Sequence, residues 1–526
     1  MENESKEGEN INEIYKKLLS NEIIAYQLNT NNKINKKITL NKKENEFFSI
    51  IINILKKNSL KTICRVAGGW VRDKLLGIES DDIDIVINDI KGREFAEILN
   101  RELYPGNTKY GIFNKNPQKE KNIEIVNIIL FNTNIDVTNL RCEDLNKIGT
   151  PLSDAELRDF SINSLFYNVN EKKLEDFTQK GIKDLEEGLI ATPVKPEITL
   201  RVQCFAILRM LRFAIKFKFR IVNDLNNFIE NHTEEIIDKF YNKISKERIG
   251  KELVKILSIE NSSFAIAYLY SYNILDIIYL IRNYDKKNKY EEIFLKNTNL
   301  YILGEYLLKK NKILGIEICS DNFNKIHYFL FLLLFYFKDK KIRNAKINQQ
   351  IFKHTSKLGN DYYNANFYMS NNFDNLLLII NSQQYERLEL GKILRKITHK
   401  YILSILYACI AYEYIENKKL NSLIETIDED LLEKLIDKYK NFLNFIFKED
   451  LFYIDKMKLL FNGKELIDIL NMKNNKNIAV LMDYLLEEQI KNPKLNKALA
   501  IELIKKKNEE ILLSKFDEIK KNSNKI

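Results

Sequence analysis

Residues 68–73 read Gly-Gly-Trp-Val-Arg-Asp, and they decide how the surrounding chain folds. The apolar, β-branched run at 62–67 predicts a strand before them. Residues 70–76 have helical composition, and Gly77 follows where a helix C-terminal cap is expected. Two glycines let the backbone turn sharply between strand and helix. Such a turn directs backbone N–H groups toward a ligand at the helix N-terminus, an arrangement that binds phosphate, and Arg72 adds a cation beside it.

Two aspartates follow the turn on a second predicted strand, residues 80–87. Side chains alternate along a strand, so Asp82 and Asp84 are expected on one face, about 7 Å apart along the chain. Paired carboxylates beside a phosphate site suit Mg²⁺, which prefers oxygen ligands and shares them with substrate phosphates. A third carboxylate, Asp136, lies in the strand-like run 135–141. Together these residues predict magnesium-dependent nucleotidyl transfer.

Each motif alone also has an ordinary structural explanation. A Gly-Gly pair is most often a simple turn, and an Asp-x-Asp pattern on an exposed strand is usually a solvated face. The order and spacing of the two motifs together favour a catalytic domain.

The pattern Gly-Gly-x-Val-Arg-Asp followed by Asp-x-Asp resembles the head domain of class II CCA-adding tRNA nucleotidyltransferases and their poly(A) polymerase relatives, in the polymerase β-like superfamily. It is most similar to the fungal, eukaryotic-type branch. The resemblance is specific over residues 60–257 and loose elsewhere. Further matching motifs lie at residues 109–111, 139–141, 158–168, 175–178, 181–185 and 245–250, with a weak return at 462–466.

The resemblance implies a set of nucleotide-binding residues. Residues 153–159 are expected to open a helix with Ser153 as its N-cap. In the family this segment contacts the triphosphate and ribose of the incoming nucleotide, which implies that role for Arg158 and Asp159. Asn163, one helical turn beyond Asp159, is expected to share its face. A surface ion pair between Arg158 and Asp159 is the structural alternative. The turn contributes four further candidates: Gly68, Gly69, Arg72 and Asp73.

Base recognition departs from the family pattern. There, an acidic pair and an arginine on the neck helix bond the base edges of CTP and ATP, and these positions fall on Val202, Gln203 and Ala206 here. Gln203 can donate and accept a hydrogen bond, whereas valine and alanine side chains cannot. Arg209 and Arg212 remain on one helix face as candidates for binding the base or the phosphates, with salt bridges across the helices as the alternative. Two further family arginines are replaced, by Leu157 and Ala191.

The function implied by the resemblance is addition of C, C and A from CTP and ATP to the tRNA 3′ end, with release of pyrophosphate. Asp82 and Asp84 would hold Mg²⁺, with Asp136 as a third catalytic carboxylate, and the helical regions would bind the acceptor stem. The lost base-reading residues favour two alternatives. One is a CC-adding, A-adding or poly(A) polymerase variant with altered base choice. The other is an RNA-binding descendant that has lost catalysis.

Composition is consistent with a globular protein that binds a polyanion. The 526 residues are 45% hydrophobic and 30% charged, with a net charge of +10, a balance that suits RNA but also reflects a Lys- and Asn-rich sequence. The five cysteines are isolated, which argues against a disulfide framework or a zinc site. The longest apolar run, 328–337, is too short to span a membrane. We expect an intracellular protein, chiefly cytoplasmic, with mitochondrial or nuclear pools as alternatives.

The distribution of prolines indicates the domain organisation. Five of the six prolines lie between Pro105 and Pro196, and the sixth is Pro493. The residues between Pro196 and Pro493 have repeated i, i+3, i+4 apolar spacing and predict a long all-helical region. The expected fold is therefore α+β, a polymerase β-like head of mixed sheet and helices followed by helices only. The expected divisions are a polar arm at 1–44, the catalytic head at 45–190, a nucleotide-selecting neck at 191–270, a body at 271–440 and a tRNA-binding tail at 441–526.

Overall fold

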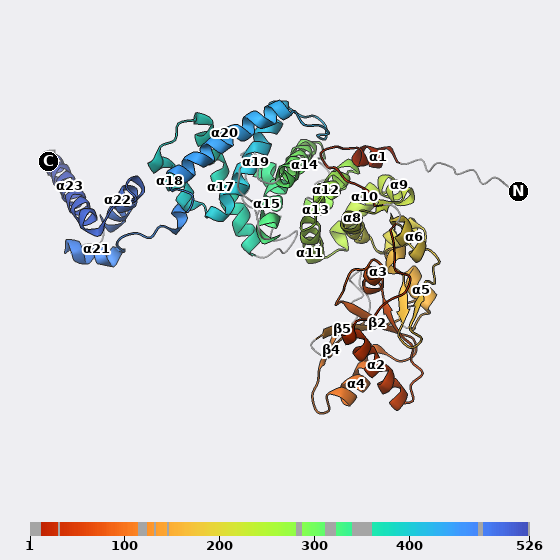
Figure 1. Ribbon diagram of the computed structural model, residues 1–526. Helices are drawn as coiled ribbons and strands as arrows, with labels where there is room; N and C mark the ends of the chain where they lie inside the picture. The colour runs from red at the N-terminus through yellow and green to blue at the C-terminus, as the bar shows by residue number, and fades with distance from the viewer. Residues whose placement is uncertain are drawn as a thin grey trace. The chain divides into compact units, whose positions relative to one another are not determined.

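The structure is a computed structural model of the chain, and its fold consists of two compact units (Figure 1). Unit 1 comprises residues 1–305, 339–359 and 421–426, and unit 2 comprises residues 306–338, 360–420 and 427–526. The residues that the structure describes are 12–29, 32–113, 124–130, 133–144, 147–279, 287–310, 322–338, 360–471 and 477–523.

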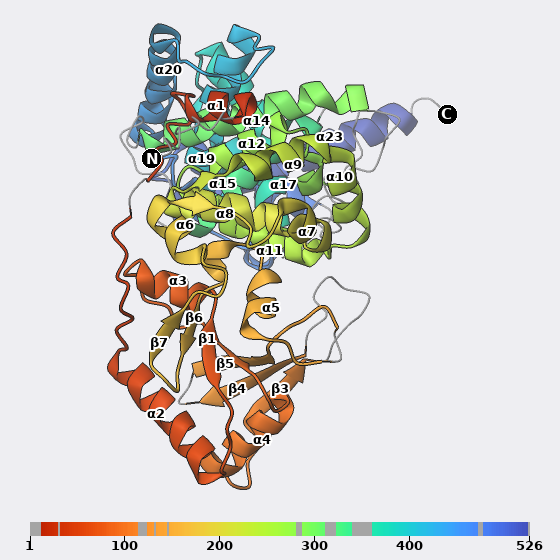
Figure 2. The same ribbon diagram turned by 90° about the vertical axis from the view of Figure 1, so that its right-hand side faces the viewer.

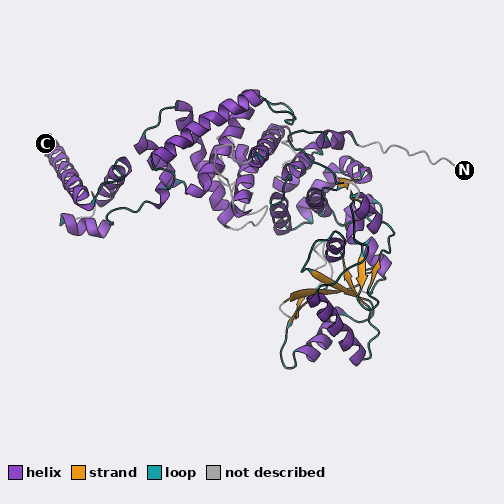
Figure 3. Cartoon of the chain, viewed as in Figure 1, coloured by secondary structure: helices purple, strands orange, loops and turns teal. Residues whose placement is uncertain are grey.

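The head begins unit 1 and is built on a seven-stranded sheet of order β3-β4-β5-β2-β1-β6-β7. Strands β2 and β5 pair in parallel, and the other neighbours pair antiparallel. Apart from the short β8–β9 pair, the described strands lie in this sheet (Figure 3). The elements of the head are α2 (Lys42–Lys57), β1 (Cys64–Ala67), α3 (Gly69–Leu75), β2 (Ile83–Ile87), α4 (Gly92–Leu103), β3 (Tyr110–Phe113), β4 (Ile125–Leu130), β5 (Thr133–Asn139), α5 (Pro151–Glu156), η1 (Ser161–Asn163), β6 (Phe166–Asn168) and β7 (Lys173–Glu175).

Helices α2 and α4 lie on one side of the sheet (Figure 2). Gly92, the first residue of α4, lies close to Val126 and Val137 of strands β4 and β5. The opposite face packs a smaller cluster in which Val86 of β2 and Ala155 of α5 are buried. Because strand side chains alternate, Asp84 shares that second face with Val86.

Helix α3 follows the Gly-Gly turn and is anchored by its tryptophan. Trp70 is 1% exposed, and its ring meets Phe48 of α2 edge-on at a centroid distance of 6.0 Å. Its Nε1 donates to the Glu44 carboxylate at 3.1 Å, and Lys74 pairs with the same carboxylate at 3.1 Å. Gly77 follows the end of α3 with φ +73°, which confirms the predicted glycine stop.

The neck completes unit 1 and is almost entirely helical. Its central helix, α8, carries both candidate arginines, Arg209 and Arg212. The elements are α1 (Glu13–Leu19), α6 (Gly181–Glu187), β8 (Leu189–Ile190), α7 (Pro196–Val202), α8 (Ala206–Phe217), β9 (Arg220–Ile221), α9 (Asn223–Asn231), α10 (Thr233–Asn242), α11 (Lys246–Leu257), α12 (Ser262–Ser271) and α13 (Asp276–Tyr279). Helix α14 (Lys287–Lys309) then leads from unit 1 into unit 2.

The N-terminal arm is more firmly held than its polar composition predicts. Residues 1–11 lie outside the described residues, but Tyr15 and Tyr26 are buried in the neck. The Tyr26 hydroxyl donates to the carbonyl oxygens of Ala214 and Phe219 at 2.6 and 3.0 Å, at the C-terminal end of α8. Two tyrosine hydroxyls that find main-chain partners allow this polar segment to be buried.

The described elements of unit 2 are all helices, which confirms the fold class predicted from the proline-free region. The predicted apolar run 328–337 is buried, and no helix among the described residues is long and apolar enough to cross a membrane. The elements are α15 (Asn322–Leu334), η3 (Phe335–Lys338), α17 (Asn360–Ser382), α18 (Arg387–Lys396), α19 (His399–Lys418), α20 (Glu429–Lys448), η5 (Ile454–Lys456), α21 (Gly463–Leu470), α22 (Ile478–Lys491) and α23 (Lys497–Ser523).

Candidate active site

The carboxylates of the second strand lie on the sheet face away from α4. Asp84 and Asp136 are register partners on the parallel strands β2 and β5. Asp136 also accepts a hydrogen bond of 2.9 Å from the Asn127 side chain on β4. Asp84 is exposed between two buried neighbours, and Asp82, also exposed, directly precedes β2. Strand alternation therefore directs the two aspartates to the same side of the sheet.

The carboxylates on this face of the sheet, Asp82, Asp84 and Asp136, are oxygen ligands that suit a magnesium ion shared with substrate. Within the described ranges, no three His, Cys, Asp or Glu side chains are gathered closely enough to hold a metal ion by themselves. Magnesium usually takes one or two carboxylates and fills its remaining positions with water and substrate phosphate oxygens. Asp82 and Asp84 supply that number, and Asp136 lies beside Asp84 as a further negative charge.

The Gly-Gly turn lies at the end of β1, next to the start of β2, where Asp82 and Asp84 are. Strand β1 ends directly before Gly68 and pairs antiparallel with β2, with Val66 opposite Ile85. The end of β1 and the start of β2 therefore lie side by side. Gly68 has φ +76°, and a Cβ there would stand 2.9 Å from Nη1 of Arg158. Only glycine combines this backbone conformation with so close an approach of a guanidinium.

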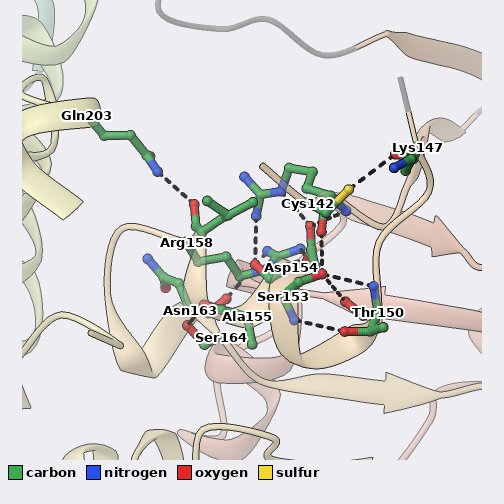
Figure 4. A network of polar contacts seen from close by, with 12 residues as sticks. Cys142, Lys147, Thr150, Ser153, Asp154, Ala155, Arg158, Asn163, Ser164 and Gln203 are labelled. Atoms are coloured by element: carbon green, nitrogen blue, oxygen red, sulfur yellow. Dashed lines mark hydrogen bonds and ion pairs between the residues drawn. The ribbon is translucent and has the colours of Figure 1, made fainter. Parts of the chain in front are cut away.

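Arg158 is held at the turn by a buried carboxylate that the sequence analysis did not single out. Asp154 is fully buried and binds Nη2 of Arg158 at 2.7 Å and Nε of Arg141 at 2.5 Å (Figure 4). Burial alone would raise the pKa of Asp154, but the two guanidinium groups lower it to about 2. The i, i+4 spacing of Asp154 and Arg158 was the one signal in the sequence that pointed to this pair.

The helix that carries Asp154 begins earlier than expected. Helix α5 starts at Pro151, and Thr150 is its N-cap in a capping box with Ser153. The prediction that Ser153 is the N-cap is therefore wrong, because proline at the first helical position and Thr150 before it give a better start.

A chain of polar contacts joins the turn to the neck. Arg72 donates twice to Asp73, at 2.8 and 2.7 Å, and once to the Asn163 side-chain oxygen at 2.6 Å. The Asn163 amide donates to Asp159 at 2.9 Å, and Asp159 pairs with Arg209 of α8 at 2.6 Å. We call these five residues the head–neck chain. Lys216, two helical turns beyond Arg209 on α8, forms an ion pair with Asp73 at 3.9 Å, so the last contact leads back to the first residues of the chain of contacts.

Charges within the head–neck chain stabilise one another. Burial alone would raise the pKa of Asp159, but Arg209 and the hydrogen bonds from Asn163 and a backbone amide lower it. The pKa of Arg209 is raised chiefly by Asp159 and in smaller part by Glu252 and Asp84. Burial lowers the pKa of Arg72 despite its contacts with Asp73.

Three arginine side chains lie against the ring of Phe213 in helix α8. The guanidinium carbons of Arg72, Arg209 and Arg212 lie 4.7, 5.4 and 4.2 Å from its centroid. Arg212 also forms a short ion pair with the buried Glu252 of α11. Cation–π contact and separate carboxylate partners allow three like charges to stand together. The three guanidinium groups are thereby held in fixed positions, each beside a carboxylate.

The predicted base-reading positions lie in different environments. Val202 ends α7 and is 63% exposed, whereas Ala206 begins α8 and is 2% exposed. Gln203, between the two helices, donates from its side-chain nitrogen to the Leu157 carbonyl at 2.6 Å (Figure 4). Of the three positions, only Gln203 offers polar atoms.

The comparisons with known proteins agree with this geometry. Residues 64–191 match the family described as the poly A polymerase head domain. The chain is 29% identical over 491 residues to the mitochondrial CCA tRNA nucleotidyltransferase of Candida glabrata, covering 84% of this chain and 90% of that one. It is 27% identical to tRNA nucleotidyltransferase cca2 of Schizosaccharomyces pombe, covering 84% and 94%. Among solved structures, the Thermotoga maritima CCA-adding enzyme complexed with tRNA shares the fold, with a TM-score of 0.59, 18% identity and coverage of 92% and 97%.

The head is thus a nucleotidyltransferase domain. Over most of its length the chain is similar to fungal CCA tRNA nucleotidyltransferases, and the predicted resemblance to class II CCA-adding enzymes is confirmed.

Replacing Gly68 tests the turn. We expect Gly68→Ala to lose about 1–3 kcal/mol of unfolding free energy from the positive φ and to weaken binding of a nucleoside triphosphate because Arg158 must move. Gly77→Ala is the matched control, since Gly77 also has a positive φ but no atom lies within 4 Å of its Cβ position. Equal triphosphate affinity in the two variants, measured by equilibrium dialysis, would show that the turn does not serve the ligand.

Replacing Asp154 tests the buried ion pairs. Asp154→Asn leaves two arginines without their carboxylate, and we expect a loss of about 3 kcal/mol in unfolding free energy at pH 7. Because the folded pKa of about 2 lies below the unfolded value of about 3.9, this stabilisation is present above pH 4 and is lost as the pH falls toward 2. The difference between wild type and variant should therefore shrink across that window in denaturant titrations. Asp144→Asn, at a partly exposed carboxylate paired with Lys147, should change stability by less than about 0.5 kcal/mol.

Proposed function

We propose that this protein adds C, C and A from CTP and ATP to the 3′ end of tRNA, releasing pyrophosphate at each step. The observation that carries the proposal is the meeting of three features at one sheet edge. These are the exposed pair Asp82 and Asp84, the Gly68 turn with Arg158 against it, and Arg209 of the neck, held at 2.6 Å by Asp159, the residue after Arg158. The relatives named as CCA tRNA nucleotidyltransferases support this choice of substrate.

Different residues would bind the triphosphate and the metal ion. The Gly68 N–H donates to the Leu165 carbonyl oxygen at 3.1 Å, so the turn would offer the triphosphate the N–H groups that follow it at the start of α3. Arg158 lies beside that turn. Asp82 and Asp84 would hold Mg²⁺, and Asp136 adds negative charge next to them. Bound Mg²⁺ would neutralise phosphate charge and help ionise the attacking hydroxyl.

The reaction is an in-line displacement on the nucleotide. The 3′-hydroxyl oxygen of tRNA forms a bond to the α-phosphorus, and the bond from that phosphorus to the β-phosphate oxygen breaks, so that pyrophosphate leaves. This chemistry depends mainly on positioning and charge neutralisation. The head–neck chain serves the positioning, because Asp159 fixes Arg209 and Asn163 fixes Arg72. Asp73 holds the other side of Arg72.

We propose that the neck, body and tail helices bind tRNA through backbone charge and the shape of the acceptor stem. The relatives from Candida glabrata and Saccharomyces cerevisiae are named mitochondrial, which favours a mitochondrial pool of this protein beside a cytoplasmic one.

Altered base choice is the second candidate function. It is supported by two positions where the family has polar base-reading residues. Here they are the exposed, apolar Val202 and the buried Ala206. The variants in question are a CC-adding enzyme, an A-adding enzyme and a poly(A) polymerase. Incubating the protein with tRNA that lacks CCA and with CTP and ATP together, one of them labelled at a time, distinguishes them. Ordered addition of C, C and A supports the first proposal, and addition of C only or A only supports the second.

Replacing the strand carboxylates tests catalysis. We expect Asp82→Ala and Asp84→Ala each to lower nucleotide incorporation at least about 100-fold, because several kcal/mol of charge stabilisation is removed and each 1.36 kcal/mol is tenfold. Unfolding free energy and tRNA binding should stay near wild type, since both side chains are exposed. Asp81→Ala, at the neighbouring exposed carboxylate, is the control and should retain activity. Full activity in both catalytic variants would refute the proposed function, and its absence from wild type would favour the RNA-binding descendant.

A further inference from the structure

A row of four residues crosses the sheet at the candidate active site. Asp84 on β2 is opposite Asp136 on β5, Asp136 is opposite Asn127 on β4, and Asn127 is opposite Gly111 on β3. Directly opposed residues of neighbouring strands project from the same face of a sheet. Gly111 and Asp84 are exposed, and Asn127 and Asp136 are half-buried. The row is therefore accessible from the face that carries the carboxylates.

Asn127 is an unusual residue for the interior of a strand. The rest of β4 consists of isoleucine, valine and leucine, whereas asparagine is depleted in strands. The Asn127 side-chain Nδ2 donates to Oδ1 of Asp136 at 2.9 Å. Gly111, the next position in the row, has no side chain that could compete for the amide. The contact with Asp136 thus accounts for a polar amide at a position where strand propensity favours a β-branched residue.

The hydrogen bond separates two like charges. Asp84 and Asp136 stand opposite each other on adjacent parallel strands, whose backbones are about 4.8 Å apart. Like charges in this arrangement repel. Asn127 lies on the other side of Asp136, so its amide draws the carboxylate toward β4 and away from Asp84. One oxygen, Oδ1, is thereby directed at Asn127, and the other, Oδ2, is left to face a ligand.

The strand order indicates which substrate would approach Asp136. In the order β4-β5-β2-β1, the Gly-Gly turn follows β1, and Asp136 lies on the far side of β2 from it. A triphosphate at the turn would have its leaving pyrophosphate nearest β1. The attacking oxygen approaches in line with the leaving group and from the opposite side. Attack would therefore come from the β5 side, where Asp136 stands.

We propose that Asn127 is a positioning residue that holds Asp136 apart from Asp84 and turns it toward the 3′-hydroxyl of tRNA. The inference rests on the proposed nucleotidyl transfer, and Asn127 itself touches neither substrate. Without the amide, the Asp136 carboxylate can turn toward Asp82 and Asp84 when a cation lies between them, and it no longer faces the hydroxyl. Partners that orient active-site carboxylates in this way commonly change activity by about 10–100-fold when replaced.

Two substitutions of the same shape separate orientation from packing. Valine and threonine are both β-branched and suit a strand, but only threonine carries a hydroxyl that can donate to Asp136. Asn127→Val removes the donor, and Asn127→Thr is its matched control, because a loss that comes from packing appears in both. The measurements are kcat for incorporation into tRNA that lacks CCA and, in the absence of tRNA, the Kd of CTP by equilibrium dialysis.

We expect Asn127→Val to lower kcat by about 10–100-fold and to leave the Kd of CTP near wild type, because the turn that would hold the triphosphate is unchanged. Asn127→Thr should recover most of the lost rate. An unchanged kcat in Asn127→Val, equal losses in the two variants, or a Kd that weakens in proportion to the lost rate would overturn the inference.

A second measurement tests the orientation without turnover. Unfolding of wild type, Asn127→Val, Asp136→Ala and the double variant is followed in denaturant with EDTA present, so that no metal ion contributes. Because residues in contact are non-additive, Asn127→Val should be less destabilising in the Asp136→Ala background than in wild type. Equal effects in the two backgrounds would contradict the inference. A wild-type protein that incorporates no nucleotide would refute the proposed function, and this cycle would still decide whether Asn127 holds Asp136.

Discussion

The site depends on the pairing of Asp159 with Arg209. Asp159 belongs to the head and Arg209 to helix α8 of the neck, and their contact at 2.6 Å is the point where the head–neck chain passes between the two. From Asp159 the chain continues through Asn163 and Arg72 to the Gly-Gly turn. Because each member is held by at least one charged partner, moving α8 would leave a largely buried charge without its partner, which is strongly unfavourable. The neck helix is thereby fixed relative to the turn that would hold the triphosphate.

Pairing also explains why so many charged side chains can be buried around the site. Arg72, Arg158 and Arg212 are largely buried, and each pairs with a carboxylate, Asp73, Asp154 and Glu252 respectively, of which Asp154 is shared with Arg141. Satisfied pairs of this kind contribute little net stability over an apolar core, but they fix direction. Their guanidinium groups are therefore held in place before any ligand binds. A polyphosphate that binds among them would meet hydrogen-bond donors that are already oriented.

Local features of the site could be predicted from the sequence, and long-range ones could not. The strand before Gly68, the glycine stop at Gly77 and the exposed alternation of Asp82 and Asp84 all follow from neighbours in the chain. The mix of predicted strands and helices indicated the α+β head, and the proline-free region with its apolar spacing indicated the helical remainder, both of which are confirmed. By contrast, Asp159 and Arg209 are 50 positions apart, and no local pattern states that they meet. The role of Asp154 could not be predicted for a related reason, because its second partner, Arg141, lies on a separate segment of the chain. The cap of α5 was misplaced since Ser153 satisfies the same pattern as Thr150.

The central claim is that Asp159 and Arg209 act as one unit joining head and neck. A double-mutant cycle with Asp159→Asn, Arg209→Gln and the combined variant, followed by equilibrium unfolding, measures their coupling directly. We predict a coupling free energy of at least about 1 kcal/mol, since contacting charged residues in one network are non-additive. Effects that add to within about 0.5 kcal/mol, as for distant independent sites, would contradict the claim.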